Sequence, residues 1–252
     1  MEAFARDGIL RVPEAFSADE AARMQAVIWG ELRARHGIDR DDRSTWTAGE
    51  ATGMKTSKRS RAFDPICGPV VASALDDLLG AGRWAKPKQY GNVLVTFPNA
   101  TEWRVPHRVW HSDFDPGFPP DQLFAVKVWA LCDDVEPGQG GTPQLAGSHR
   151  LFARYLESAS SRQYKAAKFG FLRSHPWLQA LTEDDGAPDR NERFLTEADI
   201  DGLPARVVEL TGEAGDVFIT HPWVFHSIPV NAGDRPRMLR SCAVYARGRW
   251  RP

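Results

Sequence analysis

The sequence predicts an α+β protein with a mainly β core, a jelly roll that is preceded by helices and interrupted by a helical insertion. Three observations support this: a helical repeat of apolar residues near the N-terminus, strand-like runs from residue 90 onward, and Gly-containing turns between those runs. The chain has 252 residues, of which 42% are apolar and 26% charged, a composition typical of a globular protein. Because β cores often reach this length undivided, we expect a single domain over residues 1–252.

The first part of the chain, residues 1–85, is expected to be mainly helical. Ser17 and Glu20 form a capping box, in which each side chain satisfies the other residue's backbone amide. Apolar residues then recur at three- and four-residue spacing until Gly37, which predicts an amphipathic helix over residues 17–36. Also expected here are a short strand over residues 8–12, a polar loop over residues 39–60 and a second helix over residues 69–79.

Residues 86–150 and 205–252 are expected to supply the strands of the jelly roll. Residues 92–97 (NVLVTF) are β-branched and apolar, and residues 124–131 (FAVKVWAL) present alternate side chains to two faces. Further strand-like runs cover residues 206–210, 216–220 and 238–246. Between the two strand regions, residues 151–204 show helical spacing and an acidic stretch with Gly and Pro, which predicts an insertion over one end of the sheet core.

The charge balance makes a nucleic acid or a membrane an unexpected partner. Lys and Arg total 32 and Asp and Glu total 33, so the net charge of −1 creates no global field. No apolar run approaches the about 18 residues of a membrane span, and charged residues interrupt the N-terminus where a signal segment would need to be apolar. We therefore expect a cytoplasmic protein with a small-molecule substrate; the oligomeric state cannot be read from the sequence.

Two local features have ordinary structural explanations. The three cysteines are far apart and form no CxxC pair, so we expect them to be small buried residues. A basic run is expected to be a solvated loop, with an anion-binding segment as the alternative. The run comprises Lys55, Lys58, Arg59 and Arg61.

The segment Trp110-His-Ser-Asp113 contains a candidate pair of metal ligands. His111 and Asp113 are two residues apart, so extended backbone projects both from one face, where they can share a metal ion. The third ligand must come from another strand, and His221 and His226 are the candidates; the spacing does not choose between them. Two histidines and one carboxylate are the facial arrangement of non-haem iron, which leaves positions open for a co-substrate and dioxygen.

Five motifs occur in an order that resembles the phytanoyl-CoA dioxygenase-like family of iron(II)- and 2-oxoglutarate-dependent oxygenases. Ordered motifs spread over more than a hundred residues are far more specific than any single pattern. The beginning of the chain, Phe4-Ala-Arg-Asp-Gly8 before a capped helix, is also similar to that family. The motifs are Trp110-His-Ser-Asp113, Leu131-Cys-Asp-Asp-Val135, Gly140-Gly-Thr-Pro-Gln-Leu-Ala-Gly-Ser-His-Arg150, Gly215-Asp216, and His226-Ser-Ile-Pro-Val-Asn231 followed by Arg237.

The resemblance implies a double-stranded β-helix core, the cupin-like form of the jelly roll. It implies that the catalytic metal ligands are His111, Asp113 and His226, with Fe(II) as the metal and with 2-oxoglutarate and dioxygen as co-substrates. It also assigns Arg237 to the distal carboxylate of 2-oxoglutarate, a role that suits a planar guanidinium, which is always charged. Further candidates for contacts with the co-substrate are Thr142 and Lys127.

Other residues of the same types compete for these roles. Arg235 and Arg240 are competitors of Arg237, but in a strand over residues 238–246 Arg237 and Arg240 lie on opposite faces, so only one of those two can enter the site. His149 and His221 are expected to be structural and to hydrogen-bond loop backbone.

The function that the resemblance implies is hydroxylation of a small-molecule metabolite with release of succinate and CO2. A carboxylate ligand at Asp113 favours hydroxylation or desaturation over halogenation, because halogenating relatives leave that position free for halide. One alternative is a cupin-like hydrolase or isomerase that uses the same ligands without 2-oxoglutarate, in which Arg237 is only a surface or structural charge. The other alternative is a non-catalytic jelly-roll binding module. The substrate, the position oxidised and the question of a CoA thioester stay open.

Overall fold

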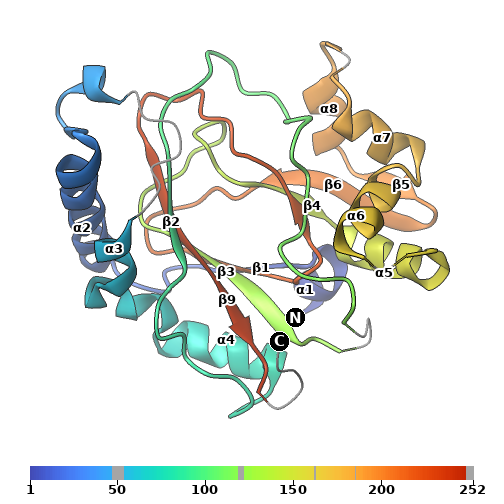
Figure 1. Ribbon diagram of the computed structural model, residues 1–252, viewed down its shortest axis with the longest axis horizontal. Coiled ribbons are helices and arrows are strands. Elements are labelled where there is room, and N and C mark those ends of the chain that lie inside the picture. Colours follow the sequence, from blue (N-terminus) through green and yellow to red (C-terminus); the bar gives the residue numbers. More distant parts are fainter. Residues whose placement is uncertain (47–53, 119–121, 162, 185, 248–252) are drawn as a thin grey trace.

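Two antiparallel β-sheets face each other, and helices cover the outer face of each (Figure 1). One sheet has five strands in the order β1-β7-β3-β9-β2, and the other has four in the order β5-β6-β4-β8. This is a computed structural model, and it describes residues 1–46, 54–118, 122–161, 163–184 and 186–247. The expected α+β class with a mainly β core is confirmed.

The bounds of the elements follow the expected order of helices, strands and insertion. The strands are β1 (Ile9–Val12), β2 (Asn92–Thr96), β3 (Ala125–Leu131), β4 (Pro143–Ala146), β5 (Ala198–Ile200), β6 (Leu203–Glu209), β7 (Val217–Thr220), β8 (Phe225–His226) and β9 (Arg237–Tyr245). The helices are α1 (Glu2–Asp7), α2 (Ala18–His36), α3 (Lys55–Arg59), α4 (Pro69–Leu79), α5 (Ser148–Ser158), α6 (Tyr164–Leu172), α7 (Pro176–Thr182) and α8 (Arg190–Leu195), with 3₁₀ helices η1 (Arg43–Thr45) and η2 (Arg61–Cys67).

Helix α2 forms as its N-terminal pattern predicts. The Ser17 hydroxyl accepts a hydrogen bond from the Glu20 amide at 3.3 Å, and the Glu20 carboxylate accepts one from the Ser17 amide at 2.8 Å. The helix ends at Gly37, whose φ of 66° lies in the left-handed region that glycine adopts without strain. Its apolar stripe is fully buried against the five-stranded sheet, and the predicted helix over residues 17–36 is confirmed.

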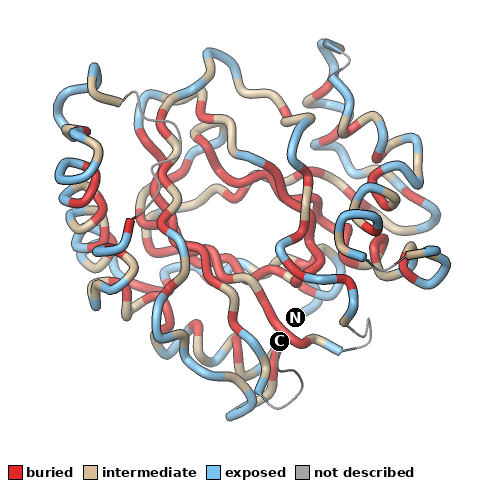
Figure 2. The backbone as a smooth tube through the Cα atoms, viewed as in Figure 1, coloured by how far each residue is buried: buried red, intermediate tan, exposed pale blue. Residues whose placement is uncertain are grey.

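Alternation along β3 separates the outer core from the space between the sheets. Val126 and Val128 point outward and pack with the N-terminal helices, whereas Lys127 and Trp129 point inward between the sheets. Buried residues therefore follow the strands in Figure 2, while the exposed residues lie mostly on helices and loops. This alternation brings Lys127 into the space between the sheets together with other polar side chains.

The insertion covers the outer face of the four-stranded sheet and not one end of the sheet core, so that expectation is wrong. Helices α5 to α8 lie together on that face (Figure 1), and Phe152 of α5 has ring contacts at 5.2 Å with Phe171 of α6 and at 5.1 Å with Phe225 of β8. These aromatic contacts bury the outer face of the sheet. Beneath them, the inner face of β8 is left for the site.

Of the predicted loop over residues 39–60, residues 47–53 lie outside the described residues, and the rest is wrong in part because it contains η1 and α3. The basic run Lys55–Arg61 is therefore a short helix and the start of η2, not a loop. The cause is distant in sequence: the Glu31 carboxylate of α2 accepts hydrogen bonds from the amides of Thr56 at 2.9 Å and Ser57 at 2.6 Å, which satisfies the start of α3. Within the described ranges, none of the helices has both the length and the apolarity needed to cross a membrane.

Candidate metal centre

A two-residue antiparallel bridge brings the candidate ligands together. The His111 amide donates to the His226 carbonyl at 2.9 Å, and the His226 amide donates to the His111 carbonyl at 2.8 Å. Side chains of such paired residues lie next to each other, and here the imidazole centroids are 4.3 Å apart. The bridge explains how residues more than a hundred positions apart meet.

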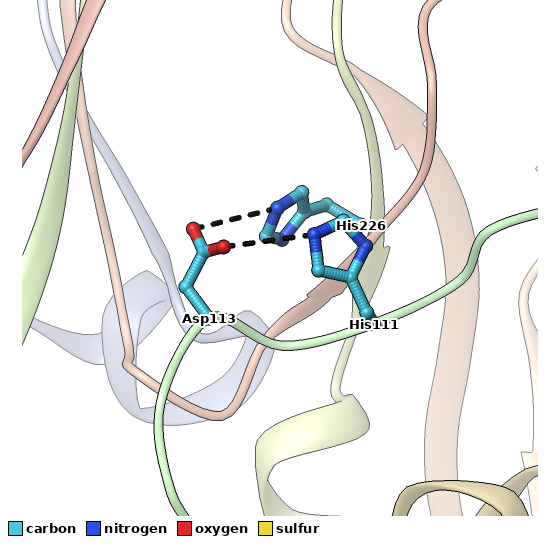
Figure 3. Close-up of side chains that lie close together, drawn as sticks. All are labelled: His111, Asp113 and His226. Atoms are coloured by element: carbon cyan, nitrogen blue, oxygen red, sulfur yellow. Dashed lines mark ion pairs between the residues drawn. The ribbon is translucent and has the colours of Figure 1, made fainter. Parts of the chain in front are cut away.

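Asp113 completes the cluster from the turn that follows His111. Its two carboxylate oxygens lie 3.6 Å from Nε2 of His111 and 3.6 Å from Nε2 of His226, and Figure 3 shows the carboxylate facing both rings. The candidate ligand atoms of the three residues all lie within 4.8 Å of one another. This is the separation expected of donors that share one metal ion.

The protonation states of the cluster suit a divalent metal. Burial raises the pKa of Asp113, but His111, His226 and Lys127 outweigh that effect and hold it well below its usual range. Burial lowers the pKa of His226 to about 3, so its ring is neutral at neutral pH. A carboxylate and a neutral imidazole are the forms that bind metal. The donor set therefore fits Fe(II).

Backbone carbonyls orient the two imidazoles. Nδ1 of His111 lies 2.9 Å from the Val109 carbonyl, and Nδ1 of His226 lies 3.5 Å from the Val224 carbonyl. A proton on Nδ1 that is held by a carbonyl leaves the lone pair on Nε2, which faces Asp113 in both cases. The Lys127 ammonium donates to Oδ2 of Asp113, the oxygen that also faces His226, and helps to fix the carboxylate.

The three candidates for the co-substrate line one cavity with the cluster. The cavity has a volume of about 670 Å³ in the described part of the chain, and its wall includes Arg237, Thr142 and Lys127. Arg237 is 2% exposed; its Nε donates to the Gly140 carbonyl at 2.6 Å and its Nη1 to the Leu94 carbonyl at 3.3 Å. The buried Thr142 hydroxyl has no hydrogen-bond partner among the described residues, so it is available to a ligand.

The competing arginines lie elsewhere. Arg240 is on the opposite face of β9, where its guanidinium stacks 4.1 Å from the centroid of the Phe63 ring, inside the outer core. Arg235 is exposed on the loop before β9. Arg237 is therefore the arginine of this segment that reaches the cavity, and burial lowers its pKa to about 9, which still leaves it charged at neutral pH.

His221 does not join the cluster. Its ring packs 4.9 Å from that of His149, beneath α1, and its Nδ1 accepts a hydrogen bond from the Trp223 amide at 3.1 Å. Nε2 of His149 lies 3.2 Å from the Ala5 carbonyl. Both rings thus contact backbone outside the cavity, which agrees with the structural roles expected for them.

The buried histidine pair is expected to make the protein less stable in mild acid. Burial lowers the pKa of His149 to about 4 and that of His221 well below its usual value, so both stay neutral in the fold. Their pKa in an unfolded chain is about 6.5, so the unfolded state gains protons first as the pH falls. Stability is therefore complete above about pH 6.5 and declines as the pH falls toward 4.

Urea unfolding between pH 7.5 and 4.5 measures this decline. The variant His149→Gln is expected to reduce the slope of the unfolding free energy against pH, because one buried titrating group is removed. His107→Gln, which changes a partly exposed histidine, serves as the control. Equal slopes in all three proteins would contradict the prediction.

Tyr164 is a residue near the site that sequence reasoning missed. It lies at the start of α6 in the insertion, and its hydroxyl donates to the carbonyl of Ser112, the residue between His111 and Asp113. The two partners are 52 positions apart, so no local pattern could reveal the contact. The insertion thus supports the loop that carries two of the candidate ligands.

Two facing antiparallel sheets with a His-Asp-His cluster between them are typical of jelly-roll enzymes that bind a divalent metal. The model of the family described as phytanoyl-CoA dioxygenase matches residues 4–239. The chain therefore belongs to the phytanoyl-CoA dioxygenase family, and it is an enzyme of the iron- and 2-oxoglutarate-dependent oxygenase superfamily. No curated protein matches its sequence.

Solved structures with the same fold span nearly the whole chain. HygX from Streptomyces hygroscopicus, with nickel and 2-oxoglutarate bound, is 14% identical with a TM-score of 0.57, covering 98% of this chain and 87% of its own. AviO1 from Streptomyces viridochromogenes Tue57 is 16% identical with a TM-score of 0.55, covering 100% and 95%. The epimerase SnoN, in complex with Fe3+, alpha ketoglutarate and nogalamycin RO, is 21% identical with a TM-score of 0.53, covering 97% and 81%. These likenesses confirm the expected double-stranded β-helix.

Proposed function

We propose that this protein is a hydroxylase that uses Fe(II), 2-oxoglutarate and dioxygen to oxidise a small-molecule metabolite, with release of succinate and CO2. The observation that carries the proposal is that the His111, Asp113 and His226 cluster and the buried Arg237 line the same cavity. The cluster holds the metal, and Arg237 grips the distal carboxylate of 2-oxoglutarate. The bound metal and co-substrates supply the oxidant.

The protein's own residues position the co-substrate and the metal ligand Asp113, supply charge, and shield one side of the cluster from water. The unpaired Thr142 hydroxyl offers the co-substrate a further hydrogen bond, and the Lys127 ammonium holds the Asp113 carboxylate in place. Trp129 packs edge-on beneath His226, with ring centroids 5.1 Å apart, and closes that side of the cluster to water. A fixed cluster that is shielded from water on one side helps to keep a reactive oxidant on its substrate.

Two observations favour this reaction over the alternatives. Arg237 is buried in the wall of the cavity that contains the cluster, where its charge can bind an anionic co-substrate that the hydrolase or isomerase alternative does not use. Asp113 fills the position that a halogenating enzyme leaves free. The reaction that we propose within the superfamily is hydroxylation, whereas the solved structures with this fold include proteins described as an epimerase, a carbocyclase and a monooxygenase.

Anaerobic calorimetry followed by turnover tests the proposal. We expect the protein to bind Fe(II) and then, with iron bound, 2-oxoglutarate. A metabolite screen in air is then expected to yield a compound that stimulates succinate formation and gains one oxygen atom, measured by mass spectrometry. Iron binding without 2-oxoglutarate binding would favour the hydrolase or isomerase alternative, and the absence of both would favour the binding module.

A further inference from the structure

One peptide group links Arg237 on β9 to Glu209 on β6. The Gly140 carbonyl accepts the hydrogen bond from Nε of Arg237 at 2.6 Å, and the amide of the same peptide group, that of Gly141, donates to Oε1 of Glu209 at 2.9 Å. The other carboxylate oxygen of Glu209 accepts from the Gly138 amide at 2.8 Å. The Glu209 carboxylate therefore holds the segment 138–141 by two hydrogen bonds. One of them is to the N–H of the same peptide group whose carbonyl binds Arg237.

The segment passes so close to Glu209 that a side chain on it would not fit between them. A Cβ added at Gly141 would lie 2.5 Å from Cγ of Glu209 and 2.6 Å from the Leu210 carbonyl, closer than real Cβ atoms approach. A Cβ at Gly140 would lie 3.4 Å from Cβ of Arg237. The glycines thus allow the backbone to pass between the two side chains in direct contact with both.

The half-buried carboxylate of Glu209 has no role in the proposed reaction. Burial raises its pKa to about 7, and the opposing influences are the amides of Gly138 and Gly141 and the charge of Arg237. Arg206, on the same strand, is engaged with Asp7 and Glu197 on the molecular surface. A carboxylate that accepts a hydrogen bond from the N–H of a peptide group polarises that group and makes its carbonyl a stronger acceptor. The effect of Glu209 is therefore transmitted through the 140–141 peptide group to Arg237.

We infer that Glu209 is a positioning residue for co-substrate binding, which fixes the 140–141 peptide so that its carbonyl orients the Arg237 guanidinium toward 2-oxoglutarate. The inference rests on the proposed function, because it takes Arg237 as the co-substrate ligand. The alternative explanation is that Glu209 only compensates the charge of Arg237. If Glu209 only offset the charge of Arg237, then removing its charge would strengthen the attraction of Arg237 for an anion.

The variant E209Q distinguishes a positioning role from simple charge compensation, because the two predict opposite changes in the affinity for 2-oxoglutarate. Glutamine keeps the size of the side chain but turns an NH₂ group toward one of the two amides, so that contact is lost. We expect the affinity of the Ni(II)-loaded protein for 2-oxoglutarate, measured by anaerobic calorimetry, to fall about tenfold, the scale of one hydrogen bond to a charged group. Affinity for Ni(II) alone is expected to stay the same. Tighter binding of 2-oxoglutarate in E209Q would overturn the inference.

Glu213→Gln is the matched control, since Glu213 is exposed on the turn before β7. Amide hydrogen exchange gives a readout independent of any ligand: the amides of Gly138 and Gly141 are expected to exchange faster in E209Q and unchanged in Glu213→Gln. Failure of the unmodified protein to bind 2-oxoglutarate would count against the proposed function, whereas normal binding with no effect of E209Q would count against Glu209 alone.

The unmodified protein provides a second test should E209Q fail to fold. The Glu209 carboxylate is charged above about pH 7 and gains a proton below it, which removes one acceptor. We expect 2-oxoglutarate affinity to be higher at pH 8 than at pH 6, with faster exchange at the Gly138 and Gly141 amides at pH 6 after correction for intrinsic rates. Identical affinities and corrected exchange rates at the two pH values would overturn the inference.

Discussion

Replacement of Asp113 by alanine is expected to abolish turnover of 2-oxoglutarate and to weaken Fe(II) binding by more than about a hundredfold. Even the loss of a residue that only hydrogen-bonds to a metal ligand lowers metal affinity about ten- to a hundredfold. Two effects act together. The change removes the carboxylate of the cluster, and it leaves the Lys127 ammonium without its partner beside His111 and His226. An unpaired positive charge at that place repels a divalent cation.

Calorimetric titration with Fe(II) under anaerobic conditions and an assay for succinate measure the effect of Asp113→Ala. Asp115→Ala is the control, because Asp115 is an exposed aspartate two residues further along the same loop and outside the cluster. It is expected to bind iron normally. Unchanged iron affinity in Asp113→Ala would refute the proposed metal ligands.

Replacement of Arg237 by alanine is expected to weaken 2-oxoglutarate binding at least about thirtyfold while iron still binds. Truncating one partner of a buried, hydrogen-bonded charge pair costs about 2 kcal/mol or more, which corresponds to that factor. Arg237→Lys keeps the charge but loses the planar fork and the bond to Gly140, so we expect it to recover only part of the affinity.

Anaerobic binding of 2-oxoglutarate to the iron-loaded variants checks this prediction, and the melting temperature reports whether each variant is folded. Arg235→Ala, a change at an exposed arginine two residues earlier, is the control and is expected to bind normally. Unchanged 2-oxoglutarate affinity in a folded Arg237→Ala protein would contradict the role of Arg237 in binding this co-substrate. It would not affect the assignment of the metal ligands.

The elements that local sequence could predict were those stabilised by local interactions. The capping box before α2 and the glycine after it involve neighbours within a few residues, and the alternation in β3 is a property of one strand. Helix α3 was missed because its cap comes from Glu31 on another helix, 25 residues away. The position of the insertion was wrong because spacing indicates that helices form and not which face of a sheet they cover.

The same distinction applies to the candidate site. The spacing of His111 and Asp113 indicates a shared face, and alternation in β9 separates Arg237 from Arg240, as the structure shows. Spacing could not choose between His221 and His226, because that choice depends on which of them pairs with His111 across the barrel. Glu209 was missed for a similar reason: its partners are backbone amides about seventy residues earlier, and backbone has no sequence signature.

The contact between Tyr164 and the Ser112 carbonyl has a consequence for redesign. The insertion packs on the outer face of the four-stranded sheet, and none of its described residues lines the cavity. Yet one of its side chains supports the loop between two candidate ligands. Exchanging the insertion for another sequence is therefore expected to change the strength of metal binding, unless a tyrosine is retained at this point of α6.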